Sequence, residues 1–206
     1  MSDSTTPFGQ AKYQVRFDWG ASGAGRIVPG VHVVVLADAL LFTTGVVVAA
    51  EQGAETRIDG PDAAAASAVI DASLATVDDP IVLAASLRNR TAVAERILAL
   101  QEERGERMLV AVVAVGDTDR LTIEDQLTAG AVVDALVGLG LDHTSPEAAV
   151  ASAAFEGLRR ALVHLIGASG SGVELTADGR KAEVRLATRL DVTRVVPELH
   201  EGVFRV

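Results

Sequence analysis

The chain has 206 residues, of which 49% are hydrophobic and 22% charged. This much apolar material excludes a chain that is disordered over most of its length. A formal net charge of −10 without a run of Lys or Arg excludes a nucleic-acid binder, which needs a cationic face. The absence of cysteine from the sequence excludes disulfides, thiolate metal sites and cysteine nucleophiles.

Domain organisation and location follow from the same quantities. We expect residues 1–10 to be a frayed, disordered end, and residues 11–206 to form a single α/β domain or two closely joined lobes. The first ten residues lack the basic and apolar regions of a signal peptide, and no apolar run approaches the roughly 18 residues that span a bilayer. These features predict a cytoplasmic protein without membrane contact. A mean hydropathy of +0.32 with alanine-rich helices predicts a homodimer.

Strand and helix patterns begin at residue 13. Residues 13–19 alternate apolar and polar side chains, which predicts a half-buried strand. The glycine-rich stretch 20–30 is interpreted as a turn. The β-branched run 31–37 is typical of a strand buried on both faces in a parallel sheet. Thr43 and Thr44 then have the side chains of helix N-caps, and a helix is expected over 45–52.

The rest of the chain continues the alternation. Buried strands are predicted at 81–85 and 109–115, and helices at 62–75, 91–104, 123–139 and 145–164. Short segments follow at 173–175, 182–187 and 195–196. Strands that alternate with helices predict an α/β fold, a three-layer α/β/α arrangement with a largely parallel or mixed central sheet.

Two glycine-rich segments are weighed as phosphate loops. Residues 20–25 are expected to precede a strand, and residues 167–172 to follow a helix and lead into a strand. A dinucleotide-binding fingerprint must instead follow a strand and open a helix, and a Walker motif needs Gly-Lys-Ser/Thr, which is missing from the sequence. Both segments are therefore interpreted as flexible connections.

Polar side chains gather directly after the predicted strands. In open α/β sheets ligands bind beyond the carboxyl ends of the strands, so these positions are candidates for a site. Carboxylates, hydroxyls and guanidinium groups together suit Mg²⁺ and an anionic substrate. The three clusters are Asp38 with Thr43 and Thr44; Ser86, Arg88, Asn89 and Arg90; and Asp117 with Glu124 and Asp125.

Each cluster also has a purely structural interpretation, and spacing leaves both open. Asp38 can cap the loop after its strand, and the two threonines can cap a helix. Arg88 and Arg90 can lie on a solvated surface, while Glu124 and Asp125 can complement a helix dipole. The four histidines have no metal-ligand spacing and no order that indicates a catalytic triad, so they receive no role.

Three segments, in order, resemble the 2-phosphosulfolactate phosphatase family. They are VVVLADALLFTT at 33–44, ASLRNRTAVA at 85–94 and IEDQLTAGA at 123–131. Residues 15–20, 145–148 and 191–197 are also similar to family segments. The resemblance implies a magnesium-dependent phosphatase that hydrolyses a small anionic phosphate monoester. The partner that the resemblance implies is a small phosphorylated metabolite, such as the 2-phosphosulfolactate that gives the family its name.

Matching positions carry the family's roles onto this chain. The resemblance implies that Asp38, Glu124 and Asp125 are catalytic, and that these three with Asp117 bind Mg²⁺. The residues implied to bind or orient the phosphorylated substrate are Thr43, Thr44, Ser86, Arg88 and Asn89. Phosphoryl transfer depends mainly on positioning and on neutralising oxyanions, which this set of side chains can do.

Two departures from the family pattern support a different reading. Leu41 stands where an arginine is common, which removes a natural phosphate partner. The stretch 61–80 is short where the family normally carries a longer insertion rich in small polar groups. The alternative is therefore a catalytically inactive homologue that acts as an anion-binding or assembly protein.

Overall fold

The computed structural model describes residues 6–117 and 120–206. Its strands are β1 (Val15–Trp19), β2 (Val33–Ala37), β3 (Thr56–Arg57), β4 (Ile81–Ala85), β5 (Val110–Ala114), β6 (Glu198–His200) and β7 (Val203–Arg205). Its helices are α1 (Gly20–Ile27), α2 (Phe42–Glu51), α3 (Ala64–Leu74), α4 (Arg90–Arg104), α5 (Ile123–Gly138), α6 (Pro146–Leu158), α7 (Leu162–Ala168), α8 (Gly170–Ala177) and α9 (Lys181–Ala187). Short 3-10 helices lie at Pro7–Gly9, Pro61–Ala63 and Arg159–Ala161.

The described strands form one mixed sheet in the order β1-β5-β2-β4-β6-β7-β3. The first four strands in this order are parallel, with Val33 opposite Val110 on one side and Ile81 on the other. The remaining pairings are antiparallel, and the contact between β4 and β6 is the single pair Leu83 and Glu198. The expected α/β fold with a mixed sheet is confirmed.

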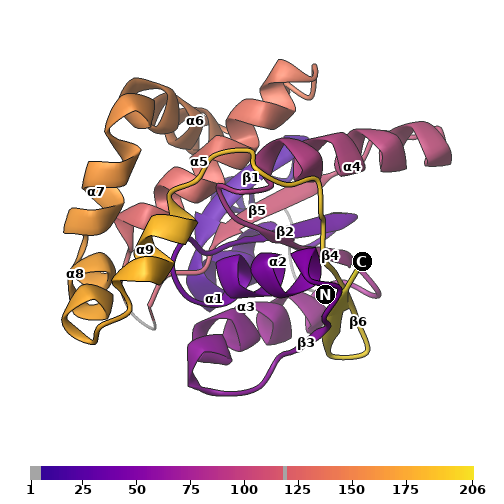
Figure 1. Ribbon diagram of the computed structural model, residues 1–206. Helices are drawn as coiled ribbons and strands as arrows, with labels where there is room; N and C mark the ends of the chain where they lie inside the picture. Colours follow the sequence, from indigo (N-terminus) through magenta and orange to yellow (C-terminus); the bar gives the residue numbers. More distant parts are fainter. Residues whose placement is uncertain (1–5, 118–119) are drawn as a thin grey trace.

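Helices cover both faces of the sheet (Figure 1). Alternate β2 residues face opposite ways: Val33 and Val35 join one apolar cluster with α4, α5 and α6, whereas Val34 and Leu36 join another with α1, α2 and α3. A third cluster lies beyond the carboxyl ends of the strands and draws on α5 to α9. The three layers thus have a helical cap over the edge where ligands bind in such folds.

Two local predictions are wrong because glycine allows close packing. The stretch 20–30 is mostly the helix α1 and not a turn; Gly23 in it has its Cα beside Asp18, where a Cβ would be 2.8 Å from Cγ. The segment after Gly167 likewise forms the helix α8 and not a strand. A Cβ on Gly172 would lie 2.1 Å from the Ile166 carbonyl oxygen. Tertiary contact overrides the low helix propensity of glycine at both places.

The expected disorder of residues 1–10 is contradicted in part. Pro7–Gly9 form a 3-10 helix, and the buried Gln10 side chain exchanges two hydrogen bonds with the backbone of Phe17. Residues 1–5 lie outside the described residues. Over the stretches that the structure covers, no helix combines the length and the apolarity needed to cross a membrane.

Candidate functional site

The site is sought where β2 and β5 lie side by side in the parallel sheet. After β2 the chain enters α2 on one face, and after β5 it enters α5 on the opposite face. Loops that diverge in this way leave a crevice at the carboxyl edge, and this switch point is the usual ligand position in open α/β sheets. Asp38 follows β2, while Asp117, Glu124 and Asp125 follow β5.

Asp38 acts as the cap of α2. Its Oδ1 accepts the N–H groups of Leu40 and Leu41, both at 3.1 Å, and its Oδ2 accepts that of Phe42 at 2.7 Å. The side chain is buried, with 6% of the residue exposed. The Phe42 N–H is the first of α2 and has no intrahelical partner, and the Leu40 and Leu41 N–H groups belong to the loop that enters the helix. The capping interpretation of Asp38 is therefore confirmed, and its carboxylate is largely committed to the backbone.

Asp125 joins the loops that follow β2 and β5. Its Oδ1 accepts the Ala39 N–H at 2.8 Å, and its Oδ2 accepts the Gly116 N–H at 2.9 Å and the Thr122 hydroxyl at 2.7 Å. Burial raises the pKa of the Asp125 carboxyl well above its ordinary value, and the negative charge of Asp38 raises it further. Burial also raises the pKa of Asp38. The two predicted catalytic aspartates therefore form a closely interacting buried pair.

Thr43 and Thr44 lie inside α2 and do not cap it. The Thr43 hydroxyl is 2.6 Å from the Asp38 carbonyl oxygen and 2.7 Å from the Ala85 carbonyl oxygen. The Thr44 hydroxyl donates to the Ala39 carbonyl oxygen at 2.6 Å. The prediction of threonine N-caps is wrong, because the Asp38 carboxylate fills that role. Both hydroxyls instead tie the start of α2 to neighbouring backbone.

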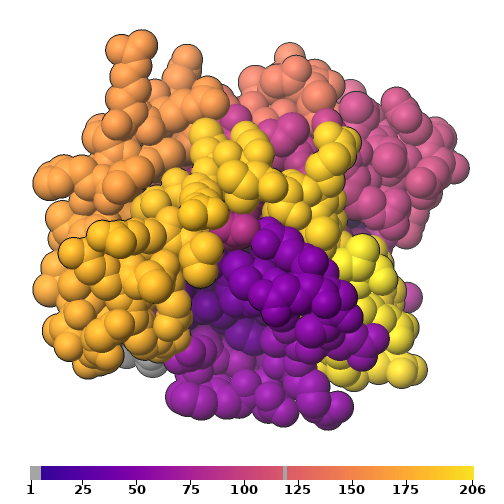
Figure 2. All heavy atoms as spheres, viewed as in Figure 1, coloured from indigo at the N-terminus to yellow at the C-terminus, as the bar shows by residue number. Residues whose placement is uncertain are grey.

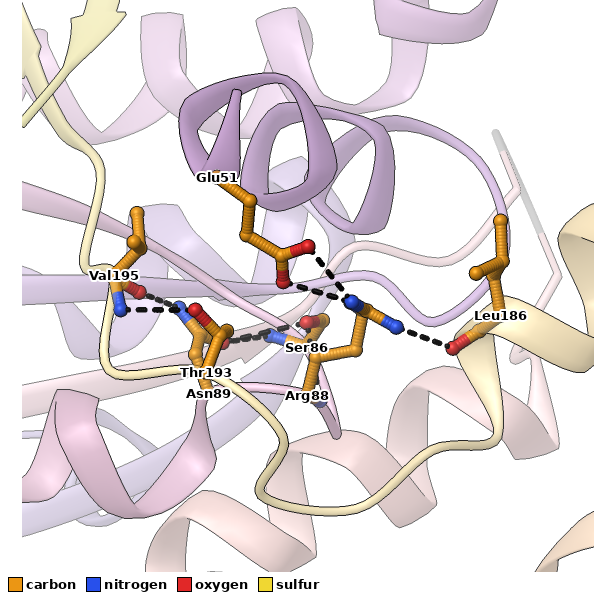
Figure 3. Close-up of polar contacts among 7 residues, drawn as sticks. All are labelled: Glu51, Ser86, Arg88, Asn89, Leu186, Thr193 and Val195. Carbon is orange, nitrogen blue, oxygen red and sulfur yellow. Dashed lines mark hydrogen bonds and ion pairs between the residues drawn. The ribbon is translucent and has the colours of Figure 1, made fainter. Parts of the chain in front are cut away.

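The segment 86–90 is held against the C-terminal part of the chain (Figure 3). Arg88 makes a two-pronged ion pair with Glu51 at 2.8 and 2.9 Å and donates to the Leu186 carbonyl oxygen. The Asn89 amide donates to the Val195 carbonyl oxygen, while its Oδ1 accepts the Ser86 N–H at 2.9 Å. These side chains, predicted to bind substrate, all make internal bonds.

Arg90 also holds the C-terminal part of the chain, through a segment that we call the strap. We define the strap as residues 188–197, which run from α9 to β6 and lie across the front face between α2 and α4 (Figure 2). Arg90 pairs with Asp191 of the strap at 2.9 Å and with Asp134 of α5 at 2.7 Å. Arg88 and Arg90 are both buried, so the alternative interpretation that they lie on a solvated surface is wrong.

Glu124 differs from its neighbour Asp125. It is buried, with 3% of the residue exposed, yet within the described residues its carboxylate has no hydrogen-bond or ion-pair partner. One turn later on α5, the Thr128 hydroxyl is fully buried and, among the groups described, also lacks a partner. Native proteins rarely leave buried polar groups unpaired, and such groups indicate an unseen ligand or water.

Glu124 lines a cavity of about 230 Å³ at this edge of the sheet. The N-termini of α5 and α8 both border it, and helix N-termini favour anions because their first N–H groups lack intrahelical partners. The lining residues described are Asp117, Arg120, Leu121, Thr122, Ile123, Glu124, Ser169, Gly170, Ser171 and Glu174. Asp117 forms an exposed ion pair with Arg120 at 2.7 Å.

The contribution of α8 is absent from the sequence-based site. Ser169 caps α8 by accepting the Gly172 N–H at 3.1 Å, and Ser171 and Glu174 follow on the cavity wall. A serine followed by small residues is the available signal, because such residues favour a helix start. From sequence the segment is interpreted as a flexible connection, because it follows a predicted helix and leads into a predicted strand.

The predicted metal ligands do not gather in one place. Asp117 and Glu124 line the cavity, whereas Asp38 and Asp125 use their oxygens on backbone and Thr122. In the described ranges no three His, Cys, Asp or Glu side chains lie close enough together to hold a metal ion. A full protein cage is thus not formed by these residues, although Mg²⁺ commonly needs only one or two carboxylates besides phosphate and water.

Comparisons with known proteins agree on one family. The model of the 2-phosphosulpholactate phosphatase family matches residues 68–202. A curated relative from Synechococcus sp. (strain WH7803), named probable 2-phosphosulfolactate phosphatase, is 34% identical over 130 residues, covering 62% of this chain and 51% of the relative. This chain thus spans about half the length of that relative. The family match includes the cavity residues from Asp117 to Glu174, but not Asp38.

Proposed function

The chain belongs to the 2-phosphosulpholactate phosphatase family, and we propose on that premise that it hydrolyses a small anionic phosphate monoester in the cavity lined by Glu124. The observation that carries this proposal is Glu124, a largely buried residue whose carboxylate lines the cavity between two helix N-termini and has no protein partner in the described part of the chain. A phosphate ester with its cation supplies what both features lack, a positive charge for the carboxylate and a negative charge for the N–H groups.

Mg²⁺ is the cofactor that we propose, and the residues present fit it. The Glu124 carboxylate oxygens accept no hydrogen bond from the residues that the structure describes, and Asp117 lies on the same cavity wall. Mg²⁺ prefers such oxygens and completes its shell with substrate phosphate and water. When bound, it would neutralise phosphoryl oxygens and activate water. We assign Glu124 and Asp117 as the residues that hold it.

Asp38 and Asp125 have a different task in this proposal. Their carboxylates accept N–H groups from residues 39–42 and 116, so they hold the loops after β2 and β5. The first N–H groups of α5 and α8, at residues 123–124 and 170–171 on the cavity wall, orient the phosphate, and Arg120 lies on the same wall. Thr43, Thr44, Ser86, Arg88 and Asn89 support this scaffold through their internal bonds and do not bind the phosphate directly.

Phosphate release tests the proposal. The substrates are 2-phosphosulfolactate and a panel of small phosphate monoesters, each with Mg²⁺ or with EDTA. We expect release that needs Mg²⁺ and that falls about 100-fold in Glu124→Gln, as expected for loss of a metal ligand or acid–base group. Glu156→Gln, an exposed change on α6 away from the cavity lining, is the matched control. Unchanged activity in Glu124→Gln would contradict the proposal.

The second candidate is a non-catalytic anion-binding protein. It is favoured by the internal commitment of the predicted phosphate ligands, above all the pairing of Arg88 with Glu51. The match over only 51% of the curated relative points the same way. Absence of release from every ester, with folded protein and a phosphate-dependent rise in melting temperature, would establish this candidate instead.

Assembly and location stay predictions. A homodimer is expected from the apolar composition, and exposed Val150 and Val163 on α6 and α7 are consistent with a partner surface. Sedimentation equilibrium of the purified chain measures the mass directly, and a monomer at micromolar concentration would contradict the expectation. The cytoplasmic location is likewise an expectation from composition.

A further inference from the structure

The side of α6 that faces solvent is largely apolar. Val150 on this side is 63% exposed, and Leu158 is 41% exposed. A helix that is apolar around its whole circumference is normally buried on all sides. We use the name α6 face for the exposed apolar and small residues of this helix, which are Ala149, Val150, Ala153, Gly157 and Leu158.

No described part of the chain covers the α6 face. The helix is the outermost of the layer formed by α4, α5 and α6, because it packs on α5 and on the edge strand β1, and it lies at the periphery of the ribbon in Figure 1. Val163, which is 67% exposed, continues the apolar surface along the chain into α7. The face is therefore available to a partner.

The α6 face is complementary to a second copy of itself. Successive helix residues are about 100° apart, so Val150 and Gly157, two turns apart, point the same way. A twofold axis between residues 153 and 154 lays two α6 helices antiparallel, with Val150 of each over Gly157 of the partner subunit. The valine side chain then fills the space that the glycine leaves, and the two helices can approach closely.

The charges at the two ends of α6 fit the same arrangement. Glu147 is in the first turn of α6 and Arg160 follows its last turn, and both are exposed. Within the described residues neither side chain has an ion-pair partner. The two positions are equally far along the chain from the twofold axis, so each Glu147 comes opposite Arg160 of the partner subunit. Two ion pairs then form across the contact.

The charge of this segment favours a second copy over a strongly charged partner. The whole chain has a net charge of −10, which repels two copies over most of their surface. Residues 146–161 are neutral, since their charged residues are Glu147, Glu156, Arg159 and Arg160. A cationic or an anionic protein finds no net opposite charge there, whereas a second copy matches both ends.

We propose that the α6 face is the contact between two copies of this chain, paired antiparallel about a twofold axis between Ala153 and Ala154. The proposed function includes a homodimer expected from composition, and this inference goes beyond it by assigning the contact and its symmetry. It is independent of the phosphatase activity, because no residue of the α6 face lines the cavity at Glu124.

Substitution of Gly157 tests the contact without disturbing the fold of one copy. A Cβ on Gly157 meets nothing within 4 Å in the chain itself, and glutamine favours a helix more than glycine does. Gly157→Gln should therefore fold normally but fill the space that receives Val150 of the partner subunit. We expect sedimentation equilibrium to give a dimer for the wild type and a dissociation constant at least about 100-fold weaker for Gly157→Gln.

Gly138→Gln is the matched control. Gly138 on α5 is exposed, and a Cβ there also meets nothing within 4 Å, so this variant should keep the dimer. Thermal unfolding of both variants checks that each is folded. A wild type that is monomeric at about 100 μM would overturn the inference. A dimer of unchanged strength in Gly157→Gln would overturn it equally.

Exchange of the end charges tests the antiparallel register. Glu147→Lys sets a cation opposite Arg160 of the partner subunit at both ends, so the dimer should weaken about tenfold. Arg160→Glu should weaken it by a similar factor. The double variant restores opposite charges and should bring the dissociation constant to within about threefold of the wild-type value. Additive losses in the double variant would overturn the register.

Phosphate release by the same proteins separates this inference from the proposed function. Release by a protein that does not dimerise through α6 would overturn the contact and leave the phosphatase standing. A dimer that depends on Gly157 but releases no phosphate from any ester would refute the phosphatase and support the contact.

Discussion

Glu124 and Asp125 are adjacent in the chain and both buried, yet their surroundings are opposite. Asp125 accepts three hydrogen bonds and joins two loops, whereas Glu124 accepts none within the described residues and borders a cavity. Asp38, like Asp125, is committed to the backbone, since it accepts N–H groups of residues 40–42 at the entry to α2. Acidic residues at the carboxyl edge of a sheet thus serve either the fold or a ligand, and their hydrogen bonds tell which.

Removing each carboxylate in turn tests this contrast most strongly. Asp125→Ala should lower the free energy of unfolding by about 3 kcal/mol, because one buried and two partly buried hydrogen-bond donors lose their acceptor. Glu124→Gln should change it by less than about 0.5 kcal/mol, since the Glu124 carboxylate faces the cavity and accepts no hydrogen bond from the described residues. Urea unfolding of both variants gives these values. Equal losses would remove the distinction between a structural and a ligand-binding carboxylate.

The close approach of α8 to α7 is the next feature to break. Gly172→Ala places a Cβ 2.1 Å from the Ile166 carbonyl oxygen, so α8 must shift, at a cost of about 2 kcal/mol. The shift displaces Ser171 and Glu174 on the cavity wall, and phosphate-ester turnover should fall about tenfold. Gly167→Ala, whose Cβ meets nothing within 4 Å, is the control. Full turnover in Gly172→Ala would separate α8 from the site.

The ion pair of Glu51 with Arg88, whose backbone carbonyl oxygen accepts N–H groups of the strap, should have a smaller effect. Glu51→Gln leaves Arg88 buried with a neutral partner, and we expect a loss of about 1 kcal/mol. The N–H groups of Val192 and Thr193, which donate to the Arg88 carbonyl oxygen, should exchange with solvent faster. Hydrogen exchange followed by mass spectrometry measures this. Unchanged protection of 191–196 would show that the strap does not depend on the pair.

The pH dependence of stability tests whether Asp125 is the buried structural carboxylate of the pair Glu124 and Asp125. The pKa of Asp125 is raised in the folded protein, so the folded state binds this proton more tightly than the unfolded chain. The stability that this proton adds to the folded state is fully present below the pKa of aspartate in the unfolded chain, which is near 4. It is lost as the pH rises through the raised pKa of Asp125 in the folded protein. The destabilisation caused by Asp125→Ala should therefore be larger at pH 4 than at pH 7. Urea unfolding of the wild type and Asp125→Ala at pH 4 and pH 7 measures this difference. A larger destabilisation at pH 7 would refute a raised pKa of Asp125.

Much of the fold was predictable because local patterns and tertiary packing agree. The β-branched runs that form β2, β4 and β5 are buried on both faces, as a parallel central sheet requires. The Ser145–Pro146 start of α6 is confirmed, since the Ser145 hydroxyl accepts the Ala148 N–H at 3.1 Å. At α1 and α8 the local signal opposes the final structure, because glycines that disfavour a helix are needed there for close packing.

The candidate site was predictable in part. The residue types after the strands correctly direct attention to the carboxyl edge, where the charge of Asp38 acts on Asp125 and the neighbouring Ala39 N–H donates to Asp125 across 86 residues of sequence. Spacing does not distinguish a committed carboxylate from a free one. Sequence spacing also does not predict that residues 169–174 lie beside the start of α5. Their position depends on how α7 and α8 fold back over the edge of the sheet.

Sequence by itself determined the fold class, the buried strands and the family, because periodicity, β-branched runs and ordered motifs are local properties of the chain. Only the tertiary structure decided what each polar side chain does. Arg88, Asp38 and Glu124 are all charged residues near strand ends, but one pairs with Glu51, one caps α2 and one borders a cavity. Hydrogen-bond partners and burial are set by neighbours distant in sequence, and these decide whether a charge stabilises the fold or remains available to a ligand.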